Sequence, residues 1–83
     1  MHLDIITPNG HAWSGEAEAV QVPGTKGSFE MLRNHAPILS TLTPGQVRIR
    51  QEGGAVHCFR IDGGVIEAGG NRLTLLTETV QPL

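Results

Sequence analysis

Apolar and polar residues alternate along much of this chain with the period of two that is typical of β-strands. The clearest case is the stretch 46–51, in which Val47 and Ile49 alternate with Arg48 and Arg50. A strand with this pattern has one face in a core and the other in water. The stretch therefore predicts a half-buried strand.

Gly and Pro divide the rest of the chain into short pieces of a similar kind. Further strands are expected at residues 3–7, 13–22 (as one or two strands), 28–32, 38–42, 55–62, 65–68 and 72–77. Residues 53–54 predict a two-residue hairpin turn, and residues 69–71 join the last two strands. Gly15 is expected to form a bulge or corner. No segment has convincing helical spacing, and the tail 78–83 is too short for a useful helix.

Eight to ten short strands with closely spaced turns favour an all-β sandwich. Eleven Gly and five Pro among 83 residues agree with this, because both serve turns better than the interior of a helix. The length allows one domain, residues 1–83, which is marginally stable by itself. A partner that covers apolar surface would therefore help it.

Charge and aromatic content exclude several classes of partner. A net charge of -2 with six basic residues gives no footprint for nucleic acid or for an anionic membrane surface. We find no signal peptide and no apolar run of about 18 residues, so any membrane association is expected through partners. Cys58 lies in a strand-like run and is expected to be a buried, inert thiol. Trp13 is either a core residue, which we favour, or a single interface anchor.

The sequence offers no catalytic, cofactor-binding or metal-binding residues. Its four histidines have long, irregular spacings, whereas structural zinc sites use close ligand pairs; they are His2, His11, His35 and His57. Segment 24–28 places Lys before the second Gly and precedes a strand, so it is not a phosphate loop. Ser28, His35 and Asp62 lack a nucleophile elbow, so they do not predict a triad. Asp62 is better explained as a turn residue.

Residues 23–44 mix Pro, Gly, His, Asn and Arg with apolar side chains. The apolar members are Phe29, Met31, Leu32, Ile38 and Leu39. Such a segment either exposes these side chains to a partner or packs them in the core. The residues alone leave both alternatives open.

Three segments, read together, resemble the epsilon subunit of F-type ATP synthases. They are VPGTKGSFEMLRNHAPILSTLTPG at residues 22–45, GGVIEA at 63–68 followed by NRLTLL at 71–76, and HLDIITP at 2–8. The resemblance covers nearly the whole chain, and the long pattern around His-Ala-Pro is specific.

The resemblance implies a flattened two-sheet β-sandwich of about ten short strands. It also implies a non-catalytic subunit of the central stalk, the rotor, which links the gamma subunit to the membrane c-ring. Such a subunit couples ion-driven rotation to ATP synthesis. It would lie at the cytoplasmic face of the bacterial inner membrane, within the peripheral catalytic sector, and contact the membrane only indirectly.

Two contact segments follow from the resemblance by position. The side facing the c-ring would comprise Lys26, Gly27, Ser28, Phe29, Glu30 and Met31. The side facing gamma would comprise His35, Ala36, Pro37, Ile38 and Leu39.

The sequence departs from the family pattern at three places. Glu30 replaces a usual Gly, which implies either an ordinary backbone there or an added carboxylate at the ring-facing edge. Arg33 replaces a common Pro, which would loosen the loop. The C-terminal helical hairpin of most members is expected to be absent, so we expect neither ATP binding nor inhibition by that hairpin.

Two other hypotheses remain beside the rotor subunit. One is a small β-sandwich enzyme or metal-binding protein that uses His35 and His57, which a metal titration would detect. The other is a β-sandwich adaptor unrelated to ATP synthase, which would bind no gamma subunit.

Overall fold

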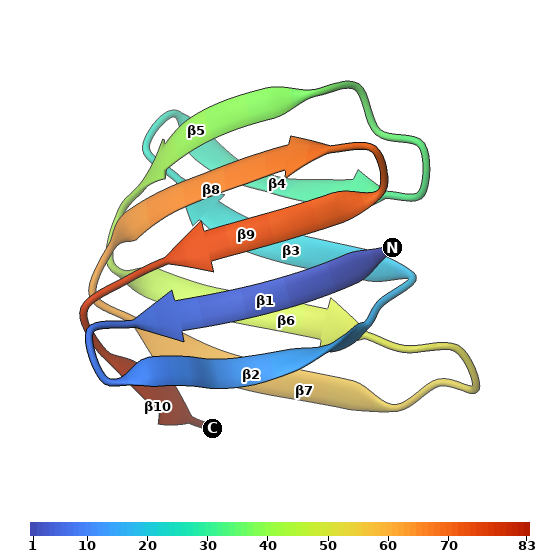
Figure 1. Ribbon diagram of the computed structural model, residues 1–83. Coiled ribbons are helices and arrows are strands. Elements are labelled where there is room, and N and C mark those ends of the chain that lie inside the picture. Colours follow the sequence, from blue (N-terminus) through green and yellow to red (C-terminus); the bar gives the residue numbers. More distant parts are fainter.

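The computed structural model describes all 83 residues as ten β-strands without a helix (Figure 1). The strands are β1 (His2–Thr7), β2 (Gly10–Glu16), β3 (Ala19–Gly24), β4 (Gly27–Leu32), β5 (Ile38–Leu42), β6 (Gly45–Arg50), β7 (Val56–Ile61), β8 (Gly64–Gly69), β9 (Arg72–Leu76) and β10 (Val80–Pro82). The structure holds no helix long and apolar enough to span a membrane. The predicted all-β class is confirmed.

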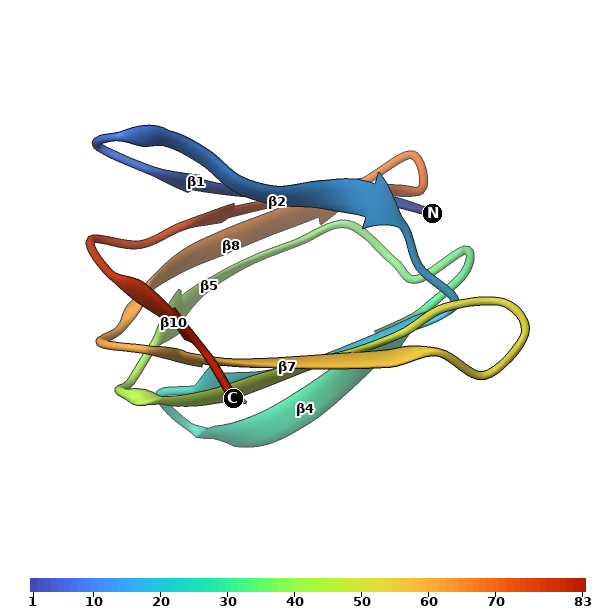
Figure 2. The same ribbon diagram turned by 90° about the horizontal axis from the view of Figure 1, so that it is seen from below.

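The strands form two facing layers, which are seen edge-on in Figure 2. One layer has the order β5-β8-β9-β1-β2, and the other has the order β4-β3-β6-β7-β10. All pairs are antiparallel except β1 with β9. A single β3–β5 pair, Gly24 with Leu42, joins the layers along one side. The predicted two-sheet sandwich of about ten short strands is therefore confirmed.

The core lies between the layers and is filled from alternate strand positions. Leu3 and Ile5 of β1 and Val47 and Ile49 of β6 are all 0% exposed. Burial of an aliphatic side chain of this size stabilises a fold by about 1.5–3 kcal/mol. The cluster of 16 buried apolar residues is therefore the main source of stability.

The stretch 13–22, predicted as one or two strands, forms two, but its bulge lies elsewhere than predicted. It belongs to two strands, β2 and β3, and the break falls at residues 17–18. The bulge lies at Ala12, because the register passes from the Ile5–Trp13 pair to the Ile6–His11 pair. Gly15 instead gives room to Trp13, since a Cβ at this position would lie 3.0 Å from the indole ring.

The turns also refine the prediction. Gln51 donates its backbone N–H to Ala55, so three residues, rather than the predicted two, separate the hydrogen-bonded ends of the β6–β7 hairpin. The β8–β9 hairpin turns at Gly70 and Asn71, both with φ near +60°. The tail, which had predicted no element, adds β10 to β7 because its Val80 pairs with the core strand.

Side chains close the open side of the sandwich between β2 and β7. The rings of Trp13 and His57 pack 5.6 Å apart. The Gln51 amide donates to the Glu16 carbonyl at 2.9 Å and accepts from the His57 ring at 2.9 Å. Trp13 is thus half-buried at this seam, against the core, and not inside it as predicted. Cys58 is also half-buried, where full burial was expected.

Candidate partner-binding surface

The segment predicted to face the c-ring is a tight hairpin tied to the opposite layer. Lys26 lies in the two-residue turn between the paired Gly24 and Gly27. Gly27 has a φ of +125°, which favours glycine. The Thr25 hydroxyl is 2.9 Å from the Thr41 hydroxyl, and the Thr25 N–H donates to the Thr41 carbonyl at 3.1 Å. The turn therefore presents Lys26 from a fixed position.

The strand after this turn divides the predicted residues between surface and core. Ser28 and Glu30 are exposed, and Phe29 is half-buried against the core. Met31 is 0% exposed and belongs to the core cluster, so its side chain is not part of the surface. Glu30, which replaces a usual Gly of the family, does not have a positive φ. Its backbone is therefore that of an ordinary strand residue.

The segment predicted to face gamma begins with an exposed loop that two asparagines hold in place. The Asn34 N–H donates to the Asn71 side-chain oxygen at 2.7 Å, and the Asn71 amide donates to Asn34 at 3.1 Å. The His35 N–H donates to the Leu32 carbonyl at 3.1 Å. Asn34 therefore anchors a loop in which Arg33 replaces the usual Pro.

The two predicted segments meet at one groove of about 740 Å³. It is lined by residues 24–29 from the β3–β4 hairpin, residues 38–41 from β5, and Val65 of β8. Leu39, at its rim, is 70% exposed. The groove thus takes in most of the ring-side segment and the end of the gamma-side segment, whereas His35, Ala36 and Pro37 lie outside its lining.

Sequence reasoning missed a row of apolar side chains on the outer face of the β5-β8-β9-β1 layer. Ile6 pairs with Leu76, and Leu76 pairs with Val65. Leu76 is 49% exposed, while Ile6 and Val65 are partly exposed. Leu39 of β5 lines the groove together with Val65, and we call the four side chains of Ile6, Leu76, Val65 and Leu39 the apolar stripe. Apolar outward positions near strand ends are the signal that could have indicated it.

The far end of the stripe borders a second hollow of about 440 Å³. Ile6 and Leu76 line it beside Asp62. Burial tends to raise the pKa of Asp62, but hydrogen bonds from the Thr79 N–H and the Thr77 hydroxyl outweigh it and lower the pKa below the ordinary 3.8. Asp62 therefore acts as the predicted turn residue that ties β7 to the segment before β10.

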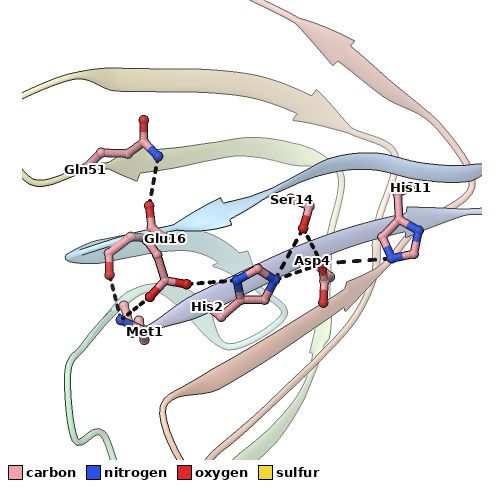
Figure 3. Close-up of polar contacts among 8 residues, drawn as sticks. Met1, His2, Asp4, His11, Ser14, Glu16 and Gln51 are labelled. Atoms are coloured by element: carbon pink, nitrogen blue, oxygen red, sulfur yellow. Dashed lines mark hydrogen bonds and ion pairs between the residues drawn. The ribbon is translucent and has the colours of Figure 1, made fainter.

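A polar cluster occupies β1 and β2 (Figure 3). The His2 ring lies 2.8 Å from a Glu16 oxygen and 3.2 Å from an Asp4 oxygen, and the Ser14 hydroxyl donates to Asp4 at 2.6 Å. Hydrogen bonding to Glu16 and then to Asp4 raises the pKa of His2 above 6.5. The Ser14 hydrogen bond lowers the pKa of Asp4 below 3.8, against the opposing effect of burial. The cluster thus ties edge strand β2 to β1.

The structure does not assemble the groups considered for catalysis or metal binding. Ser28 bonds to Gln21, His35 to the Ala36 carbonyl, and Asp62 to the threonines near β10. No three His, Cys, Asp or Glu side chains gather closely enough to hold a metal ion. The surface features that remain are the groove and the apolar stripe.

Comparison with known families agrees with the sandwich architecture. The family described as "ATP synthase, Delta/Epsilon chain, beta-sandwich domain" matches residues 1–82. The chain therefore belongs to the β-sandwich family of ATP synthase delta and epsilon chains.

Curated relatives named ATP synthase epsilon chain differ in length. The protein of Chlorobaculum tepidum is 44% identical over 78 residues, which are 94% of this chain and 89% of the relative. That of Chlorobium limicola is 42% identical with the same coverage. Epsilon chain 1 of Methylococcus capsulatus is 42% identical over 79 residues, and the chain spans only 56% of that relative.

Solved structures share the fold at low sequence identity. A chain of the Euglena gracilis mitochondrial ATP synthase, in a structure of OSCP, F1 and c-ring, matches with a TM-score of 0.91 and 21% identity. A chain of the Tetrahymena thermophila enzyme, in a structure of the central stalk and c-ring, gives 0.80 and 16%. Each match covers 96% of this chain, and 51% and 64% of the respective neighbour.

Proposed function

We propose that this chain is a non-catalytic central-stalk subunit of the F-type ATP synthase rotor. It links the gamma subunit to the membrane c-ring and thereby couples ion-driven rotation to ATP synthesis. It acts by binding proteins and uses no cofactor or nucleotide. In a bacterial cell it lies at the cytoplasmic face of the inner membrane, which it contacts only through the complex.

The observation that carries the proposal is the exposure of Leu39, at one end of the apolar stripe. A Leu39 side chain that is 70% exposed, together with the partly exposed Val65 in the same groove and Leu76 and Ile6 farther along the layer, leaves apolar area in water on a small domain. A partner that covers this area gains hydrophobic free energy and stabilises the sandwich. We assign the stripe, with the loop at His35, to the gamma subunit.

The hairpin end at Lys26 suits a different partner. Ser28 and Glu30 add a hydroxyl and a carboxylate beside the lysine, and all three side chains are exposed. Polar side chains of this kind make the hydrogen-bonded rim of protein interfaces. We assign this end to the polar loops of the c-ring, without Met31, whose side chain is buried.

A joint that carries torque needs contact loops that hold their positions. The β3–β4 turn is tied to β5 through Thr25 and Thr41, and the loop before β5 is tied to the β8–β9 turn through Asn34 and Asn71. Both contact segments are therefore braced against a sheet, which fits a mechanical role.

The test is to mix the chain with the gamma subunit of the same genome and to follow the mixture by size exclusion. A stable one-to-one complex is expected. Leu39→Glu should weaken it at least about tenfold, because a buried unpaired carboxylate costs more than 1.4 kcal/mol. Val56→Glu, at an exposed apolar position of β7 in the other layer, is the matched control and should bind normally. Failure of the folded proteins to associate would overturn the proposal.

The expected lack of nucleotide binding has its own measurement. Isothermal titration of the chain with ATP should give no heat of specific binding. Tight binding would contradict the view that this sandwich works only through proteins.

A further inference from the structure

Half of the chain's basic residues lie on the outer face of the β4-β3-β6-β7-β10 layer. Alternate residues of β6 and β7 point into the core, so the residues between them point outward. Arg48 and Arg50 of β6 and Arg60 of β7 occupy such outward positions, and all three are exposed. The chain has six Lys and Arg residues and a net charge of -2. We call the surface formed by these three side chains the arginine face.

The register of β6 with β7 brings the three arginines close together. Gln46 is paired with Arg60, and Arg48 is paired with Cys58. Arg60 is therefore the diagonal neighbour of Arg48, and Arg50 is the next outward residue on the same strand as Arg48. Diagonal neighbours lie about 7–8 Å apart, which long side chains can span. The three guanidinium groups can therefore act on the same ligand.

Two of the three arginines have no acidic partner within the chain. Arg50 lies 4.0 Å from Glu18, whereas the ion pairs of the structure include neither Arg48 nor Arg60. Neighbouring like charges repel each other, and a carboxylate that accepts two N–H bonds from one guanidinium relieves this repulsion. The arginine face therefore lacks the negative charge that would complement it.

A polar hollow beside Arg48 can hold such a carboxylate. It has a volume of about 290 Å³ and is lined by Gln21, Pro23, Ser28, Gln46 and Arg48. The side-chain amides of Gln21 and Gln46 can donate hydrogen bonds to an acceptor in it. Because Arg60 is paired with Gln46, a ligand in the hollow lies one strand away from the second free arginine.

We infer that the arginine face binds a short acidic segment of another protein. One carboxylate of this segment occupies the hollow at Arg48, and a second carboxylate contacts Arg60. Bidentate pairing of arginine with carboxylate gives such a contact direction as well as affinity. The arginine face and the apolar stripe lie on the outer faces of opposite layers (Figure 2). The acidic segment therefore does not compete with gamma, and the inference stands without the proposed function.

The acidic residues around the arginine face favour a short segment over a continuous polyanion. Glu30 of β4 lies on the same face, and Glu18 and Asp62 lie beyond its two ends. A nucleic-acid strand or an anionic bilayer that covered the whole face would meet these three carboxylates, and the net charge of -2 would repel it at longer range. A short protein segment can place its carboxylates on the arginines and leave the acidic ends uncovered.

A nuclear magnetic resonance titration of the chain with a hexaglutamate peptide tests the inference. The backbone amide and side-chain Nε–H signals of Arg48 and Arg60 should shift in a saturable way. Arg48→Glu should lower the affinity at least about tenfold, because it turns an attraction into a repulsion. Arg72→Glu is the matched control, since it makes an equal change of charge at an exposed position of β9 in the other layer. It should bind within about threefold of the parent, because salt screens a distant charge.

Several results would overturn the inference. Absence of a saturable shift, or equal losses of affinity for Arg48→Glu and Arg72→Glu, would mean that the arginine face is an ordinary solvated surface. If a DNA duplex or phosphatidylglycerol vesicles bind through Arg48 and Arg60 whereas hexaglutamate does not, the occupant is a polyanion and not a protein segment. If the chain alone forms oligomers that Arg48→Glu disperses, the occupant is a second copy.

The complex with gamma separates this inference from the proposed function. Hexaglutamate should bind the complex with an affinity within about twofold of that for the free chain, because sites on opposite layers are not coupled. Arg48→Glu should leave the affinity for gamma unchanged. Displacement of gamma by the peptide would contradict the separate sites. Failure of gamma to bind, with the peptide bound as expected, would overturn the proposed function and leave this inference intact.

Discussion

Asn34 and Asn71 hydrogen-bond to each other although 37 residues separate them along the chain. Both have positive φ, 61° and 57°, a conformation that asparagine tolerates better than most residues. One lies in the loop before β5 and the other in the β8–β9 turn. Two strained turns thus brace each other and fix the loop that carries His35.

Asn71→Gly should release this loop without disturbing the β8–β9 turn. Glycine keeps the positive φ but removes both side-chain hydrogen bonds, each worth about 0.5–1.5 kcal/mol net. Amide exchange at Asn34 should become faster, and unfolding by urea should show a loss of about 1–2 kcal/mol. In a double-mutant cycle, Asn34→Gly made in the Asn71→Gly background should lower the free energy of unfolding by little more. Fully additive losses would mean that the two residues act independently.

Gly64→Ala should be among the most damaging single changes in the chain. Gly64 has a φ of +139°, and a Cβ there would lie 2.0 Å from the Leu76 carbonyl oxygen. Strain and backbone displacement should cost at least about 3 kcal/mol, which lowers the melting temperature by more than about 10 °C. Gly69→Ala, with open space around its Cβ, is the control and should change stability by about 0.5 kcal/mol or less. Similar melting temperatures for the two variants would contradict the contact.

Met31→Ala and Leu39→Ala should separate stability from binding. Met31 is 0% exposed, and its truncation should cost about 2–5 kcal/mol. Leu39 is 70% exposed, so its truncation should leave the unfolding free energy within about 0.5 kcal/mol. Under conditions in which both variants are folded, only Leu39→Ala should lower the affinity for gamma. A stable Met31→Ala protein would contradict its place in the core.

The polar cluster on β1 and β2 should make stability depend on pH. Because Glu16 and Asp4 raise the pKa of His2 above 6.5, its contribution is fully present below 6.5 and is lost as pH rises through the folded pKa. Because the pKa of Asp4 is lowered below 3.8, its contribution is lost as pH falls through that folded value. The two effects leave a window in weakly acidic solution where both support the fold.

His2→Gln should therefore destabilise the chain more at about pH 5.5 than at about pH 8.5, measured by urea unfolding. His35→Gln is the matched control, since His35 contacts no acidic side chain. In NMR titrations, Glu16→Gln should lower the pKa of His2, whereas Glu18→Gln should leave it unchanged. If the difference in unfolding free energy between the parent and His2→Gln did not change with pH, proton binding by His2 would not be linked to folding.

The sequence indicated the type of each element because alternation and turn chemistry are local. Val47 and Ile49 alternate with arginines whatever the neighbouring strands are, and glycine and asparagine mark the turns by their tolerance of positive φ. The short β10 was missed, because its three residues gain stability only from the edge of β7.

The sequence predicted only in part which side chains of the two contact segments reach the surface. Resemblance placed Met31 with its exposed neighbours, but alternation along β4 turns its side chain into the core. The β5 stretch had predicted a strand, yet the exposure of Leu39 depends on which layer lies beneath it.

By itself, the sequence determined an all-β domain with half-buried strands, its main turns and its family resemblance. Only the tertiary structure decided that the β3–β4 hairpin and β5 line one groove, and that Ile6, Leu76, Val65 and Leu39 form the apolar stripe. The physical reason is the range of the interactions. A period of two sets which way a side chain points, whereas strand order depends on hydrogen bonds between residues far apart in the chain.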